Sequence, residues 1–204
     1  MKLIERSVES LLGELASVSP APGGGSAAAL AGAMAASLCC MVCRVTLGKK
    51  SLADSWPEMK EALENAELLG ARLRRLVDED ADAFTAVVAA RKLPQEDAQD
   101  AIVHSARVPL ETLETLARLA GIVERVARKG NPSCVTDAGS AGAMVRAGAL
   151  SAAYNVRVNL PDISDESLRR SIAAGALAAL AAVEEAAGGV EHALEQSLGK
   201  WSTV

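Results

Sequence analysis

The chain has 204 residues, of which 50% are hydrophobic, and this length fits one domain that buries its own core. A formal net charge of −5 excludes a general nucleic-acid binder, because such a protein needs basic residues to face phosphates. Aromatic residues make up only 2% of the chain, so the core must be built from shorter side chains that let helices pack closely. We therefore treat residues 1–204 as a single domain.

Residues 3–16 place apolar side chains at helix spacing, with charges spread through the segment. No apolar core segment follows this charged start, so we expect no secretory signal and a cytoplasmic protein. The cysteines fit a reducing compartment as buried thiols, because they have no metal-binding partner set. They are Cys39, Cys40, Cys43 and Cys134.

The next helix is predicted to begin at Ser26, whose hydroxyl can cap it, and to end at Leu47 before Gly48. Its uncharged part, Ser26 to Cys43, approaches the length of a membrane span. Ala, Gly and Ser dominate it, however, and these residues gain little from lipid. We interpret the segment as a buried helix.

The rest of the chain repeats the helical pattern. Further helices are predicted over residues 57–92, 95–128, 136–156 and 166–187, followed by a short tail helix. Pro109 is expected to kink or split the second of these, and Gly188-Gly189 to separate the last from the tail. No strand-like alternation exceeds four residues, so the fold class is all-α, a bundle of long antiparallel helices.

Two of the predicted helices, 26–47 and 136–156, are rich in Ala, Gly and Ser over most of their circumference. Helices with small side chains approach each other closely, so both are expected at the centre. A helix without a polar face must be covered on all sides, within the bundle or by another subunit. This need favours a homo-oligomer.

The glycine run at residues 22–26, PGGGS, stands directly before the first small-residue helix. Glycines there leave backbone N–H groups free and admit a ligand without Cβ contact, and the helix dipole favours an anion. The alternative is a plain turn. Lys49 and Lys50, at the far end of that helix, either face a ligand or compensate the helix dipole.

An acidic run, VDEDADAF at 77–84, lies in the middle of a predicted helix. A solvated helix face explains Asp78, Glu79 and Asp82. Asp80 lies four residues before Phe84 and therefore shares its face. A carboxylate beside an apolar face is either paired or functional.

A third group comprises GNPSCVTDAG at 130–139 and NVRVN at 155–159. Asp137 is either a first-turn acid of a helix or a general base in a dry pocket. Asn155 and Asn159 can hydrogen-bond a heterocycle or cap the helix. His104 and His192 have no partner at metal spacing, so no metal site and no resident cofactor is predicted.

The order of these motifs resembles the cyclodeaminase/cyclohydrolase family. The matching segments are PAPGGGSAAA, MVCRVTLGKK, DADAF, GNPSCVTDAG and NVRVN, spread over nearly the whole chain. The family includes the C-terminal domain of formiminotransferase-cyclodeaminase and stand-alone bacterial methenyltetrahydrofolate cyclohydrolases. The resemblance implies an all-α homodimer that acts on a one-carbon-loaded tetrahydrofolate, with or without a polyglutamate tail, and has no nucleic-acid or membrane partner.

The resemblance also implies functional residues. Lys49 in TLGKK and Asp137 in TDAG match the family pattern, as does Gln99, ten residues before Pro109. We expect Lys49 and Asp137 to share proton transfer and Gln99 to position water or the pterin edge. The implied substrate-binding residues are Pro22, Gly23, Gly24, Gly25, Ser26, Thr46, Lys50, Asp80, Phe84, Asn155 and Asn159.

This chain departs from the family pattern in two places. Ser51-Leu52 follows Lys50 where many members carry another Lys and a Tyr, and Val135-Thr136 replaces a hydrophobic-Ser pair. The first change weakens the expected grip on an anionic tail and leaves the chemistry in place.

Three functions are compatible with these residues. The first is hydrolysis of 5,10-methenyltetrahydrofolate to 10-formyltetrahydrofolate, favoured for a chain without a formiminotransferase domain. The second is cyclodeamination of formiminotetrahydrofolate, in which N10 attacks the formimino carbon and ammonia leaves. The third is a non-catalytic helical dimerisation protein. Both reactions pass through a tetrahedral carbon between two folate nitrogens, so one site serves either.

Overall fold

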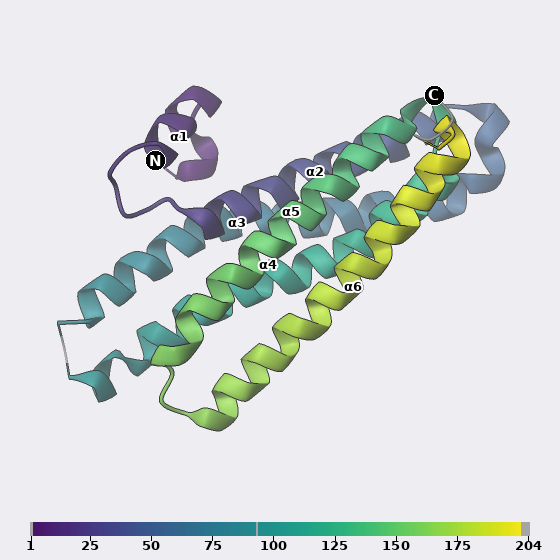
Figure 1. Ribbon diagram of the computed structural model, residues 1–204. Helices are drawn as coiled ribbons and strands as arrows, with labels where there is room; N and C mark the ends of the chain where they lie inside the picture. Colours follow the sequence, from purple (N-terminus) through teal and green to yellow (C-terminus); the bar gives the residue numbers. More distant parts are fainter. Residues whose placement is uncertain (1, 93, 201–204) are drawn as a thin grey trace.

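The computed structural model describes residues 2–92 and 94–200, and within these ranges no residue forms a strand. The all-α prediction is confirmed (Figure 1). The α-helices are α1 (Val8–Leu15), α2 (Gly24–Leu47), α3 (Trp56–Ala90), α4 (Gln95–Lys129), α5 (Val135–Asn159) and α6 (Glu166–Leu198). Short 3₁₀ helices are η1 (Leu3–Glu5), η2 (Lys50–Ser55), η3 (Pro132–Cys134) and η4 (Leu160–Asp162).

Helices α2 to α5 form the centre of the bundle, and α6 packs along α4 and α5 (Figure 1). The start of α2 meets the end of α5, where the Ser151 hydroxyl donates to the Gly24 carbonyl. The end of α2 meets the segment before α5, where the Asn131 N–H donates to the Thr46 hydroxyl. Helices α2 and α5 therefore run in opposite directions, and each end of the bundle gathers residues that are distant in sequence.

Small residues set the spacing of the central helices. A Cβ at Gly148 of α5 would lie 2.9 Å from the Ala28 carbonyl oxygen of α2. A Cβ at Gly32 would lie 2.6 Å from a Leu116 methyl and 3.0 Å from a Leu73 methyl. Neither site has room for a side chain, as the abundance of small residues in both helices led us to expect.

The N-terminal segment differs from the single helix predicted over residues 3–16. It divides into η1 and α1 because Ser7 caps α1, its hydroxyl accepting from the Ser10 N–H at 3.2 Å. Val8 is 75% exposed and Leu12 58% exposed, so only part of the apolar stripe is buried.

Pro109 was expected to kink or split its helix, and α4 continues through it without a split. Proline has no N–H and so leaves the carbonyl of the residue four positions earlier without its helical donor. That residue is Ser105, and the Asn159 amide of α5 donates to its carbonyl at 2.8 Å. The missing bond is therefore replaced from a neighbouring helix, which lets the proline stay inside the helix.

Helix α6 likewise continues through Gly188-Gly189, where a break was predicted. Gly189 lies against the Glu124 carboxylate of α4, and Val190 fills the space beside Gly142 of α5. Packing against two helices thus outweighs the poor helix propensity of glycine. By length and composition alone, α2 and α6 would each suffice to span a membrane.

The close approach of α2 and α5 gives a stability prediction. Gly148→Val is expected to lower the free energy of unfolding by about 1–3 kcal/mol, because the added carbons overlap the α2 backbone. Gly121→Ala is the matched control: nothing lies within 4 Å of its Cβ position in α4. This change should raise stability by about 0.4–1 kcal/mol. Urea unfolding measures both, and equal behaviour of the two variants would contradict the packing argument.

Candidate active site

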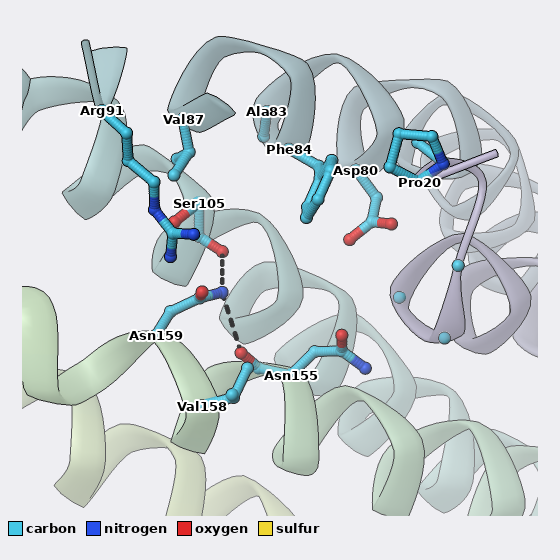
Figure 2. Close-up of a pocket in the computed structure, with 14 residues that line it drawn as sticks. Pro20, Asp80, Ala83, Phe84, Val87, Arg91, Ser105, Asn155, Val158 and Asn159 are labelled. Carbon is cyan, nitrogen blue, oxygen red and sulfur yellow. Dashed lines mark hydrogen bonds between the residues drawn. The ribbon is translucent and has the colours of Figure 1, made fainter. Parts of the chain in front are cut away.

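A pocket of about 320 Å³ opens at the start of α2, where the glycine turn meets α3, α4 and α5 (Figure 2). Its lining combines backbone, one carboxylate, one guanidinium, two amides and one aromatic ring. The lining residues are Pro20, Ala21, Gly23, Gly24, Gly25, Asp80, Ala83, Phe84, Val87, Arg91, Ser105, Asn155, Val158 and Asn159.

One face of α3 supplies most of the charged and apolar lining. Asp80, Phe84, Val87 and Arg91 follow one another at intervals of four, three and four residues, which place them on one helix face. Figure 2 shows Asp80 and Phe84 extending from α3 toward α5. Sequence analysis identified Asp80 and Phe84 but missed Arg91, although the same helical spacing extended by two turns reaches it.

Asp80 occupies the space that the glycine run leaves open. Its carboxylate lies where a Cβ of Gly25 would stand, and its Oδ2 accepts from the Ser26 hydroxyl at 2.8 Å. Burial raises the pKa of the Asp80 carboxyl, and the bonds from Ser26 lower it to a lesser extent. The absent side chain at Gly25 therefore serves a carboxylate of the protein itself.

Ser26 takes a different place from the one predicted. The helix begins at Gly24, with Gly23 as its N-cap and no side-chain capping bond. Ser26 thus lies inside the first turn, where it is buried and bonds Asp80 in place of the backbone. Pro22 is buried in the turn before the helix, while Gly23 and Gly24 line the pocket.

The two predicted asparagines close the pocket from α5. The Asn155 amide donates to the Ser151 carbonyl at 2.8 Å, and the Asn159 amide donates to the carbonyls of Ser105 and Asn155. Within the described residues nothing donates to either amide oxygen. Both oxygens are thus oriented by their own N–H bonds and remain able to accept from a ligand.

Arg91 stands at the rim of the pocket. Its guanidinium lies 3.6 Å from the Asp162 carboxylate, and the two side chains are 67% and 54% exposed. An ion pair of this exposure contributes little and is easily exchanged. Arg91 is therefore able to turn to an anionic ligand group at the mouth.

Lys49 lies at the opposite end of α2. Its Nζ donates to the Asn131 side-chain oxygen at 3.3 Å, and Asn131 is only 3% exposed. The Asn131 N–H in turn donates to the Thr46 hydroxyl at 2.9 Å, which itself donates to the Val42 carbonyl at 2.7 Å. The Thr46 hydroxyl thus both accepts and donates a hydrogen bond, and it positions Asn131. Asn131 is a residue that the sequence analysis did not identify.

The remaining predicted residues are divided between the two ends. Asp137 is in the first turn of α5, half-buried, and Lys50 is exposed in η2, both on the Lys49 side. Gln99 is near the pocket end, where its amide donates to the Asp162 carbonyl and accepts from the Ser164 N–H. Within one chain, Lys49 and Asp137 therefore do not meet Gln99.

Two further predictions concern cysteines and metals. All four cysteines are free and buried, as expected. Across residues 2–92 and 94–200, no three His, Cys, Asp or Glu side chains gather in a way that could hold a metal ion.

Residues 7–178 match the family model described as formiminotransferase-cyclodeaminase. The chain belongs to that family. The resemblance drawn from the motifs is thereby confirmed.

Relatives within the formiminotransferase-cyclodeaminase family carry two names. A methenyltetrahydrofolate cyclohydrolase of Methylorubrum extorquens is 37% identical over 79% of this chain and 82% of its own length. The formimidoyltransferase-cyclodeaminase of Rattus norvegicus is 32% identical over 80% of this chain, but the match spans only 32% of that protein. The crystal structure of a formiminotetrahydrofolate cyclodeaminase from Thermotoga maritima superposes with a TM-score of 0.91, at 31% identity, over 94% of this chain and 97% of that one.

The raised pKa of Asp80 predicts a pH-dependent stability. The folded state binds this proton more tightly than the unfolded chain, so the carboxylate costs stability as the pH rises through the pKa of the folded protein. Asp80→Asn keeps an oxygen for Ser26 and removes the buried charge. The stability of the variant relative to wild type should therefore increase as the pH rises above about 4, the ordinary range of an aspartate pKa, measured by urea unfolding. A difference that does not change with pH would contradict this assignment.

Proposed function

We propose that the chain is a methenyltetrahydrofolate cyclohydrolase, which hydrolyses 5,10-methenyltetrahydrofolate to 10-formyltetrahydrofolate. The observation that carries the proposal is the match to the Methylorubrum extorquens cyclohydrolase, because it extends over most of both chains. The pocket at the start of α2 supports it with the chemistry that a folate needs.

The pterin is the part of the substrate that fits this pocket. A flat heterocycle stacks on the exposed face of Phe84, which is 42% exposed. The Asn155 and Asn159 amide oxygens accept from ring N–H groups. The glutamate tail then points to the mouth, where Arg91 offers a guanidinium to a carboxylate.

The proposed reaction requires proton transfer and no resident cofactor. The oxygen of water bonds to the methenyl carbon and the carbon–N5 bond breaks. One water proton ends on N5 and the other is released. The attacking water must lose a proton as its oxygen bonds to the carbon. A carboxylate whose pKa is raised by burial is a better base for this proton, so we assign that role to Asp80. Lys49 and Asp137 lie at the other end of α2, so we propose that they protonate the leaving nitrogen from the second subunit of the homodimer.

The alternative activity is formimidoyltetrahydrofolate cyclodeaminase. The matches to the rat enzyme and to the Thermotoga maritima structure favour it specifically. It uses the same groups, because N10 takes the place of water and ammonia takes the place of N5 as the leaving group. We propose that either reaction occurs in a cytoplasmic homodimer, without a nucleic-acid or membrane partner.

Two substrates distinguish the activities. We expect purified protein to consume the methenyl absorbance of 5,10-methenyltetrahydrofolate without releasing ammonia. Ammonia release from formiminotetrahydrofolate, with appearance of methenyl absorbance, would establish the cyclodeaminase instead. Turnover of neither substrate by folded protein would overturn the proposed function and favour the non-catalytic dimerisation protein.

The two neighbouring lysines give a matched pair of variants. Lys49→Met should lower turnover on the order of 10²-fold with the fold intact, because proton transfer to the leaving nitrogen loses its donor. Lys50 is exposed, and the bond to Asn131 comes from Lys49, so Lys50→Met should change mainly KM. Steady-state kinetics and circular dichroism check both. Normal turnover by Lys49→Met, or similar behaviour of the two variants, would contradict the assignment.

A further inference from the structure

The outer side of α6 is an apolar surface without a cover. Helix α6 runs along one edge of the bundle, where it packs on α4 and α5 (Figure 1). In its most apolar stretch only 22% of the residues are buried, against 61% in α2. No charged residue stands between Arg170 and Glu184, so the solvent side of this stretch is almost entirely apolar. A surface helix usually turns charged side chains to solvent, and this part of α6 does not.

Leu177 stands at the centre of this surface. Its side chain is 70% exposed, and exposed alanines surround it at helical spacing. We call the following residues the α6 face: Ala174, Leu177, Ala178, Ala181 and Ala182. Because its side chains are small apart from Leu177, another helix is able to approach it closely.

The charges at the two ends of the α6 face are opposite in sign and symmetric in position. Arg170 stands seven residues before Leu177, and Glu184 stands seven residues after it. Arg169 and Glu185 repeat this relation at a distance of eight residues. Reversal of the helix direction about Leu177 therefore exchanges each arginine with a glutamate.

This symmetry identifies a second copy of the chain as the partner. A two-fold axis through Leu177 lays α6 antiparallel on its own copy, so that each residue lies opposite the one equally far beyond Leu177. Arg170 of each copy then meets the partner's Glu184, and the apolar residues meet between these two ion pairs. The opposed helix dipoles favour the same order.

The charged side chains are accessible for these contacts. Arg170 pairs with Glu166 of the same helix, and Glu184 pairs with Arg146 of α5. The exposed fractions of these four side chains range from 41% to 77%. Ion pairs of this exposure contribute little, so they do not compete strongly with a partner's charge.

A membrane surface fits the α6 face less well. A helix that lies on a membrane carries Lys and Arg beside its apolar side, where they meet anionic lipids. The α6 face instead ends at Glu184 and Glu185, and Glu191 follows two turns later. Anionic head groups would repel these carboxylates, so charge favours a second copy.

We propose that α6 is a second self-association surface, at which two copies of the chain pack antiparallel about a two-fold axis at Leu177. No residue of α6 lines the folate pocket, so this contact does not depend on the proposed activity. The contact joins one proposed homodimer to another and gives an assembly of more than two chains.

Charge reversal tests the antiparallel register. Sedimentation equilibrium of the wild-type protein should give a mass above that of two chains. Arg170→Glu places like charges opposite each other twice in each contact and should weaken the association of homodimers by about tenfold. Arg170→Glu combined with Glu184→Arg restores opposite charges and should return the association to near wild type. The pair with Arg146 stays broken in the double variant, so this recovery must come from the contact between copies.

Cysteine cross-linking tests the position of the axis. Leu177→Cys lies on the axis, and the four native cysteines are buried, so oxidation should link these chains into covalent pairs. Ala181→Cys is the matched control on the same face. Four residues separate each copy of it from the axis, which at about 1.5 Å per residue sets the two thiols about 12 Å apart along the helix. A disulfide does not span this distance, so Ala181→Cys should remain unlinked.

Leu177→Glu tests the apolar contact itself. Because Leu177 is exposed, the variant should fold, as checked by circular dichroism, and should sediment as two chains. A wild-type protein no larger than two chains, or a Leu177→Glu mass equal to wild type, would overturn the proposal. Reduction of Leu177→Glu to single chains would show that α6 forms the homodimer itself and would overturn a second surface.

The remaining outcomes concern the register and the partner. Equal cross-linking of Leu177→Cys and Ala181→Cys would overturn the axis, and a double charge reversal that fails to recover association would overturn the antiparallel order. Flotation of the wild-type protein with phosphatidylglycerol vesicles, lost in Leu177→Glu, would assign the α6 face to a membrane instead. Each result is read without folate, so failure of the proposed activity leaves this test unchanged.

Discussion

The close contact between α2 and α5 is the constraint on which the rest of the structure depends. Gly148 lets the two helix backbones approach until a single Cβ would collide with the Ala28 carbonyl. At this separation the Ser151 hydroxyl reaches the Gly24 carbonyl, which ties the glycine turn to the last turns of α5. The turn then presents Gly25 to α3 so closely that the Asp80 carboxylate occupies the place of a Cβ. The shape of the pocket therefore depends on the spacing of α2, α3 and α5. Added side-chain volume at Gly25 or Gly148 would disturb it directly.

In the pocket, side chains that make structural hydrogen bonds keep one polar atom available for a ligand. Pro109 frees the Ser105 carbonyl, and the Asn159 amide nitrogen satisfies it. That bond fixes the orientation of the amide and directs its oxygen toward the cavity. Asp80 is similar, because Ser26 holds one oxygen while burial opposes the charge. Such a carboxyl is costly to the fold, which is typical of groups retained for function.

Much of this architecture was predictable from residue patterns, and the failures have particular physical causes. The starts of α3 and α5 follow, to within one residue, from Pro57 and from the break before Val135, which are local signals. The continuation of α6 through Gly188-Gly189 depends on packing against Glu124, a contact that no local sequence pattern reveals. At the site, helical spacing placed Asp80 with Phe84, and the predicted helix already put Lys49 at the far end from the glycine run. That α3 and α5 bring Asp80 and Asn155 to the start of α2 appears only in the structure, because it depends on how the helices pack.

The partly exposed apolar side chains of α2 and the placement of the candidate residues at its two ends have a common origin in this topology. A bundle of small-residue helices needs cover on every side, and α6 supplies it for α4 and α5 only. The side of α2 that α6 leaves open carries Leu30, Met34, Leu38, Met41 and Val45, of which Met34 is 48% exposed and Val45 40% exposed. The same helix directions also decide which side chains each end of α2 receives, because α3 and α5 bring Asp80 and Asn155 to its start while Asn131 and Asp137 stand at its end. The cover of the small-residue helices and the placement of the candidate residues are therefore two results of one topology.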